Sequence, residues 1–318
     1  MNSFDEIFTE IKNYQTIILH RHRHPDPDAI GSQAGLALSL RLAFPGKKIL
    51  CAGGPVGDLD WINTMDEVED SDYEKALVIT TDSADQPRVS DQRFKDGEKI
   101  IKIDHHPNID PYGDLQFVDP QAPAASEIVF DFLKAENLPL NKKIATALYA
   151  GIIGDTGRFM YQETSAHTFD VARQLTEQGI DISAIARQLS EVTLEEAKLQ
   201  NLVLNWMHVD ACGAAYAILT TADLEKAGVA AGQASVTVST PGRIKGIIAW
   251  NVFIEQEDGT FRVHYRSKGP EIDKLAQRHH GGGHALASGA QAKDRQEIEE
   301  IFAELVAATK AYKENHDH

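Results

Sequence analysis

Short apolar runs alternate with longer amphipathic segments in the first half of the chain. Runs rich in Val, Ile and Leu predict four buried strands, at residues 16–20, 47–54, 76–84 and 98–106. Helical spacing of apolar residues predicts four helices, at residues 29–44, 123–136, 141–153 and 165–179. Strands that alternate with helices predict an α/β fold, in which a mostly parallel sheet is flanked by helices.

The pattern changes in the second half. Strands are predicted at residues 214–220, 246–256 and 260–268, and Asp258-Gly259 predicts a hairpin turn between the last two. Helices are predicted at residues 272–279 and 297–312. We therefore expect three parts: an α/β domain at residues 1–186, a helical linker at 187–209 and a smaller α+β domain at 210–318.

Composition excludes several classes of protein. The 318 residues carry a net charge of −17, which disfavours a non-specific binder of long duplex nucleic acid. No apolar run approaches the roughly 20 residues of a membrane span, and the acidic start is unlike a secretory signal. The only cysteines, Cys51 and Cys212, argue against a disulfide framework, so we expect a cytoplasmic protein.

Charge and histidine are unevenly distributed. Residues 241–284 carry seven Lys or Arg against five Asp or Glu, so a small anionic ligand fits there better than a long polymer. Eight of the thirteen histidines fall in three short clusters, at residues 20–24, 105–106 and 279–284. Such clusters are typical of ligand sites rather than of scattered surface positions.

The first cluster lies in LHRHRHPDPDAIGS, residues 19–32. A residue before proline favours extended backbone, and alternate residues of an extended segment point the same way. The residues of one parity are His20, His22, His24, Asp26 and Asp28, so we expect several ligands on one side, although the turn itself breaks strict alternation. For Asp28 alone, a helix N-cap and a metal ligand are about equally supported, whereas Asp26 and Asp28 together with a histidine favour metal.

Three more acidic positions follow strands or a helix. Asp82 and the run Asp104-His105-His106 end strands, and Asp155 ends an apolar helix. Taken singly, an Asx-turn or a helix-ending turn explains each aspartate. Taken together they form a set of carboxylates and imidazoles without thiolates, which suits two Mn²⁺ or similar ions about 3.5–4 Å apart. The predicted ligands are His22, Asp26, Asp28, Asp82, His105 and Asp155.

The third cluster lies in HHGGGHALASG, residues 279–289. Three adjacent glycines allow backbone N–H groups to converge on an anion, and Arg266, at a strand end upstream, can grip a phosphate. The alternative is a flexible loop before a helix. We favour anion capture because histidines flank the glycines.

Five motifs in this order resemble the DHH phosphoesterase superfamily with its DHH-associated C-terminal domain, over nearly the whole chain. They are HRHPDPDAIGS (22–32), TTDSA (80–84), DHH (104–106), GDTGRF (154–159) and GGGH (281–284). Within the superfamily, the chain looks most like the bacterial nanoRNases and pAp phosphatases.

The resemblance implies roles for matching residues. His22 and Asp26 would hold one Mn²⁺, Asp28, His105 and Asp155 the other, and Asp82 would bridge them. His106 would face the scissile phosphate. The implied substrate contacts are Arg158, Arg266, Ser267, Gly282, Gly283 and His284. His20 and His24 do not match positions that the family motifs specify. We interpret His20 as strand-end packing or support for the ligands, and His24 as a neighbour of the substrate.

The implied activity is hydrolysis of RNA of about two to five nucleotides to mononucleotides, and of 3′-phosphoadenosine 5′-phosphate (pAp), by in-line attack of a metal-bridging hydroxide. Three alternatives stay open: a phosphodiesterase for cyclic or linear dinucleotides, a manganese pyrophosphatase, and a non-catalytic nucleotide sensor. Filled ligand positions argue against the sensor. The sequence leaves open the cleavage polarity, the physiological metal and whether the chain forms a homodimer.

Overall fold

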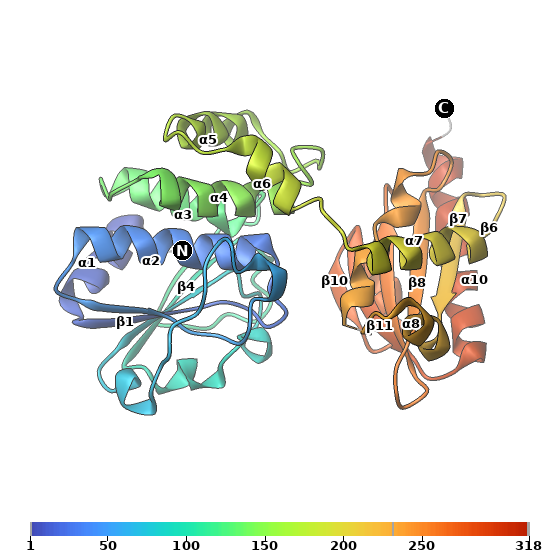
Figure 1. The fold of residues 1–318 in the computed structure, drawn as a ribbon, viewed down its shortest axis with the longest axis horizontal. Coiled ribbons are helices and arrows are strands. Elements are labelled where there is room, and N and C mark those ends of the chain that lie inside the picture. The colour runs from blue at the N-terminus through green and yellow to red at the C-terminus, as the bar shows by residue number, and fades with distance from the viewer. Residues whose placement is uncertain (1, 231, 317–318) are drawn as a thin grey trace. The chain divides into compact units, whose positions relative to one another are not determined.

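Two β-sheets, each with its own hydrophobic core, organise the chain (Figure 1). The computed structural model describes residues 2–230 and 232–316. Residues 1–190 form the first unit and residues 191–318 the second. Each unit is described separately below.

The first unit is built on a five-stranded sheet in the order β2-β1-β3-β4-β5, and all its strand pairs are parallel. The strands are β1 (Thr16–His20), β2 (Lys48–Cys51), β3 (Leu77–Thr81), β4 (Lys99–Asp104) and β5 (Leu115–Val118). This arrangement confirms the predicted parallel sheet. Strand β5 was not predicted, because its sequence LQFV has only a short apolar pattern.

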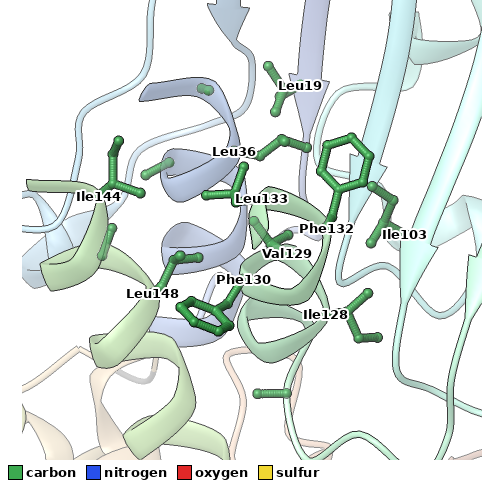
Figure 2. Close-up of a cluster of buried hydrophobic side chains, with 14 of the residues drawn as sticks. Leu19, Leu36, Ile103, Ile128, Val129, Phe130, Phe132, Leu133, Ile144 and Leu148 are labelled. Carbon is green, nitrogen blue, oxygen red and sulfur yellow. The ribbon is translucent and has the colours of Figure 1, made fainter. Parts of the chain in front are cut away.

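The helices of this unit lie on one side of the sheet. They are α1 (Phe4–Asn13), α2 (Pro27–Ala43), α3 (Ala125–Ala135), α4 (Lys142–Asp155), α5 (Ala166–Thr176) and α6 (Ile182–Gln188). Helices α2 and α3 contact the strands, whereas α5 packs on α3 and α4 (Figure 1). Figure 2 shows Leu36 of α2 next to Leu19 and Phe132 of α3 next to Ile103 of the sheet, while Leu148 of α4 lies on the other side of α2. The helices thus bury their apolar sides against strands that read as continuous apolar runs.

The opposite face is covered by loops and short 3₁₀ turns rather than by α-helices. The turns are η1 (Gly57–Leu59), η2 (Asp70–Tyr73), η3 (Gln86–Arg88) and η4 (Gln92–Asp96). Tyr73, Phe94 and Tyr112 pack there against Ile18 and Val78. The predicted helical cover therefore holds for one face only.

Helices α2 and α4 approach closely because glycines line their contact. A Cβ on Gly31 would lie 2.5 Å from the carbonyl oxygen of Ala147, and one on Gly151 would lie 2.6 Å from a carboxylate oxygen of Asp28. The Ala147 group is backbone and the Asp28 carboxylate is held by two hydrogen bonds, so a larger side chain at either position is overpacked. The close approach brings the start of α2 and the end of α4 to the same edge of the sheet.

The second unit has a six-stranded mixed sheet in the order β10-β11-β9-β8-β7-β6, in which β7 and β8 are parallel and the other pairs antiparallel. Its elements are α7 (Leu194–Trp206), β6 (His208–Val209), β7 (Ala214–Leu219), α8 (Thr221–Ala227), η5 (Gln233–Thr237), η6 (Thr240–Arg243), β8 (Ala249–Glu255), β9 (Phe261–Ser267), α9 (Asp273–Arg278), β10 (Gly282–His284), β11 (Ala287–Ala292) and α10 (Arg295–His316).

Two segments of this unit differ from their sequence-based descriptions. Helix α7, within the segment expected as a linker, buries Leu199 and Val203 in the core of the second unit. The glycine run is neither a loop nor followed directly by a helix, because it forms edge strand β10 of a hairpin. A Cβ on Gly281 would lie 2.0 Å from the carbonyl oxygen of Gly289, so close approach of β11 requires glycine there.

None of the helices within the described residues is both long enough and apolar enough to cross a membrane.

Replacing Gly31 by alanine is expected to destabilise the first unit. Alanine favours a helix over glycine by about 1 kcal/mol, but overpacking against a backbone carbonyl costs up to about 3 kcal/mol. We expect a net loss of about 1–2 kcal/mol in the free energy of unfolding, measured by urea denaturation. Gly46→Ala is the matched control, because nothing lies within 4 Å of its added Cβ. Equal stability of the two variants would contradict the packing argument.

Candidate metal centre

The predicted ligands gather at the carboxyl edge of the first sheet. β1 lies between β2 and β3, so the connections from β1 and β3 leave in different directions at this edge. Such a topological switch point is where open α/β sheets bind ligands. His22 follows β1, Asp82 follows β3 and His105 follows β4, while Asp155 is the last residue of α4.

Asp26 and Asp28 lie at the start of α2 and have different roles there. Asp26, not Asp28, is the N-cap of α2: its Oδ1 accepts hydrogen bonds from the N–H groups of Asp28 (3.0 Å) and Ala29 (2.9 Å). Its Oδ2 lies 3.6 Å from Nε2 of His22. His24 has φ +53°, so the extended backbone expected for this residue before proline is wrong, whereas the expected break in strict alternation is confirmed.

Asp28 is fully buried and is held by another helix. Its two carboxylate oxygens accept hydrogen bonds from the N–H groups of Ala125 (2.6 Å) and Ser126 (2.9 Å), at the start of α3. The unpaired N–H groups and positive end of a helix stabilise a carboxylate. The start of α3 therefore fixes the position of Asp28.

Asp82 lies between two histidines. Its Oδ2 is 3.4 Å from Nε2 of His22, and its Oδ1 is 3.3 Å from Nε2 of His105. The residue is 1% exposed and has φ +49°, a strained conformation for a non-glycine residue. Strain of this kind is typical of functional sites.

Three overlapping groups of side chains have potential ligand atoms within 4.8 Å of one another. They are His22, Asp26 and Asp82; Asp28, His105 and Asp155; and Asp82, His105 and His106. The structure thus brings together all six predicted ligand residues, in the two sets that the resemblance implied, with Asp82 adjoining both.

The histidine rings are oriented to present Nε2 to this centre. Nδ1 of His22 lies 2.8 Å from the carbonyl oxygen of Arg23, and Nδ1 of His105 lies 3.3 Å from that of Ala122. A carbonyl can only accept, so each Nδ1 carries hydrogen, and in a neutral ring Nε2 then has the lone pair. Metal-binding histidines are commonly held in this way.

Electrostatics show that the cluster requires positive charge. Burial, followed by the charge of Asp82, raises the pKa of Asp28 to about 7, and burial, followed by the charge of Asp26, raises the pKa of Asp155 well above its usual range. Burial opposes a charged His22, yet Asp26 and Asp82 raise its pKa to about 11. Without a bound cation, protons compensate the carboxylates.

Asp104 is a residue of this site that the sequence interpretation left without a role. Its Oδ1 accepts hydrogen bonds from the N–H groups of His105 (2.9 Å) and His106 (3.3 Å), and lies 2.8 Å from Nδ1 of His106. Asp104 therefore orients the His106 ring. The only sequence signal was its place in the DHH motif.

The candidate substrate residues of the second unit lie on neighbouring strands. Arg266 of β9 pairs with Ala287 of β11, which pairs with His284 of β10, so Arg266 and His284 face the same side of the sheet. Ser267 faces the other side, and its Oγ accepts a hydrogen bond from the N–H of Gly269 (3.0 Å). Gly282 and Gly283 lie in β10.

Arg158 and His20 have structural partners in the first unit. The guanidinium of Arg158 donates to the carbonyl of Leu189 (3.1 Å) and to Oγ of Ser190 (2.7 Å), so it ties the end of α4 to the end of α6. His20 is buried with its Nε2 3.1 Å from the Tyr73 hydroxyl, and burial lowers its pKa to about 4. His20 therefore packs at the strand end.

Fold and site together define a phosphoesterase scaffold, and family comparisons agree. Residues 16–152 match the DHH family N-terminal domain, and residues 213–311 match the DHHA1 domain. The chain belongs to the DHH family of phosphoesterases.

Its relatives narrow the class. The chain is 46% identical to a probable bifunctional oligoribonuclease and PAP phosphatase NrnA of Streptococcus mutans, over 96% of this chain and 98% of the relative. It is 44% identical to the bifunctional oligoribonuclease and PAP phosphatase NrnA of Bacillus subtilis, over 96% and 99%. The fold is also similar to an exopolyphosphatase-related protein of Bacteroides fragilis, with a TM-score of 0.87 at 23% identity, over 98% of this chain and 97% of that one.

Binding of Mn²⁺ to the metal-free protein is expected to release protons at about pH 7, because a cation must displace protons from groups whose pKa values are raised, such as His22 and Asp28. A higher pH removes the competing protons, so the affinity should rise between about pH 6 and pH 8. Calorimetric titration in buffers of different protonation enthalpy measures the release.

The matched control is His167→Gln, because Asp131 raises the pKa of His167 outside this cluster. It should leave the proton release unchanged. A binding enthalpy independent of the buffer would refute the assignment of these groups as ligands.

Proposed function

We propose that the chain is a divalent-metal phosphoesterase that degrades very short RNA to mononucleotides and removes the 3′-phosphate of pAp. The observation that carries the proposal is that two groups of potential metal ligands lie next to Asp82. One group is His22 and Asp26, and the other is Asp28, His105 and Asp155. The names of relatives that match nearly the full chain support the same two activities.

The residues fit two divalent ions, and we propose Mn²⁺. Carboxylates and imidazoles without thiolates suit a hard or borderline ion, and Nε2 of His105 and Oδ1 of Asp82 are buried without a hydrogen-bond partner among the described residues. His22 and Asp26 would hold one ion, Asp28, His105 and Asp155 the other, and Asp82 both. Such ions supply charge neutralisation and an activated water for attack on phosphorus.

His106 would act on the substrate itself. Asp104 holds Nδ1 of the ring at 2.8 Å and thereby directs the opposite nitrogen, Nε2. A protonated His106 would stabilise the phosphate and donate a proton to the leaving oxygen, as a general acid. Asp104 would stabilise the charged ring during that transfer.

The second unit would bind the nucleotide. Arg266 and His284 face one side of the sheet, and a guanidinium suits bidentate phosphate binding. Gly282 and Gly283 stay in this proposed phosphate site, Ser267 stays a candidate at the end of β9 although its side chain faces the other side of the sheet, and Arg158 stays a proposed substrate contact of the first unit. The net negative charge of the chain favours a short ligand over a long polymer.

We place the protein in the cytoplasm. Cys51 and Cys212 are both buried free thiols, which supports a reducing compartment.

The activity is tested by product analysis over time with Mn²⁺. The substrates are a 5′-labelled and a 3′-labelled trinucleotide, pAp, pyrophosphate and a cyclic dinucleotide. We expect mononucleotides from the trinucleotides and phosphate from pAp. Preferential cleavage of pyrophosphate or of the cyclic dinucleotide would replace the proposal with one of those activities, and no cleavage of any substrate would favour a sensor.

Asp82→Asn is expected to lower kcat on pAp at least about a hundredfold, because it removes a ligand shared by both ions. Metal content measured by mass spectrometry should fall with it. Asp58→Asn, at an exposed position of the same unit, is the matched control and should retain full activity. A variant Asp82→Asn with two bound metals and normal turnover would disprove the bridging role.

Arg266→Ala is expected to raise KM for a dinucleotide about ten- to a hundredfold, because a charge-assisted phosphate contact is lost. KM for a generic small phosphodiester should change far less, and His284→Ala should behave in the same way. Arg295→Ala, exposed at the start of α10, is the control. Equal effects on both substrates would show that these residues do not recognise the nucleotide.

A further inference from the structure

Lys102 is a fully buried lysine in the middle of β4. Its ammonium donates to the carbonyl oxygen of Ala84 (2.9 Å) and to Oδ1 of Asn108 (3.2 Å). It also lies 3.4 Å from Oδ2 of Asp104 and 4.7 Å from the centre of the Tyr112 ring. A buried charge is costly unless it is compensated, so four partners around one ammonium indicate a fixed position.

The Asp104 carboxylate connects Lys102 to His106. Its Oδ2 faces Lys102, whereas its Oδ1 contacts Nδ1 of His106 at 2.8 Å. Asp104 is fully buried, so without a nearby cation its charge would be poorly stabilised. Lys102 compensates that charge through an ion pair with Oδ2, while the hydrogen bonds of Oδ1 hold His106.

The same ammonium holds the turn after Asp82. Ala84 accepts from Lys102, and the carbonyl of the preceding Ser83 accepts from the Tyr112 hydroxyl at 3.0 Å. Asp82 has a strained backbone that its surroundings must maintain. Lys102 thus contacts both the turn that follows the shared carboxylate and the carboxylate that orients His106.

We propose that Lys102 is a positioning residue for phosphoester hydrolysis: it fixes Asp104, and through it the His106 ring, while holding the turn after Asp82. This inference rests on the proposed function, in which His106 acts on the substrate. Lys102 itself contacts neither the substrate nor the reacting atoms.

The first test is Lys102→Met, which keeps the length of the side chain and removes the charge. We expect kcat on pAp to fall about ten- to a hundredfold with KM changed less than about twofold, as for loss of a residue that supports catalytic groups. Metal content should remain that of the wild type. A kcat equal to that of the wild type in a folded, metal-loaded variant would overturn the proposal.

Two control variants of β4 separate positioning from stability and from charge. Ile101→Ala removes a buried side chain of the same strand that faces the opposite core, so it should lower the melting temperature and leave kcat unchanged. Lys99→Met removes a partly exposed lysine paired with Glu10 and should leave both unchanged. If Ile101→Ala lowers kcat as much as Lys102→Met, the role of Lys102 is only structural.

A double-mutant comparison keeps the proposal testable if Lys102→Met does not fold. In an Asp104→Asn background both buried charges can be removed, and Lys102→Met should then lower kcat by less than about threefold, because the route through Asp104 is already lost and only the contact with the turn after Asp82 remains. A further tenfold loss in the double variant would refute that route.

Ring ¹⁵N NMR of His106, in protein loaded with a diamagnetic divalent ion, measures the orientation without any activity. Lys102→Met should shift the Nδ1 resonance as the contact with Asp104 weakens, and an unchanged resonance would contradict the proposal. This readout remains valid even if the substrate is not pAp or RNA. Failure of the proposed function appears instead as an inactive wild type.

Discussion

The need to compensate buried carboxylates governs the first unit. Asp28, Asp82 and Asp104 are almost fully buried at one sheet edge, and like charges so close together cannot all persist without positive partners. Each carboxylate has a distinct source of compensation. The start of α3 serves Asp28, two imidazoles serve Asp82 and an ammonium serves Asp104.

Helix packing and site geometry are consequences of the same glycines. Gly31 and Gly151 let α2 and α4 approach until a Cβ would collide, which places Asp28 at the start of one helix beside Asp155 at the end of the other. A looser contact between these helices would separate the two ligands. Stability of the core and assembly of the metal centre therefore cannot be varied independently at this contact.

The sequence predicted what depends on local pattern. The sequence predicted the strands rich in Val and Ile and the N-cap Ser165, because periodicity and capping act over a few residues. It missed that Asp26 rather than Asp28 caps α2, since the partner that holds Asp28 is nearly a hundred residues away. It also missed Lys102, because alternation with apolar residues suggests an exposed lysine, whereas the loop containing Tyr112 covers it.

A buried carboxylate can be compensated by a side chain of the protein or by a bound metal ion. This difference explains why Asp104 is absent from the groups of candidate ligands although it belongs to the DHH motif. The ammonium of Lys102 is part of the chain and lies 3.4 Å from Oδ2 of Asp104, so Asp104 has a cationic partner without an exchangeable ion. Asp26 and Asp155 have no such ammonium within ion-pair distance among the described residues, and only imidazoles approach them. In the proposed function, Asp104, which an ammonium compensates, orients His106, whereas Asp26 and Asp155, which lack an ammonium partner, help to hold the ions.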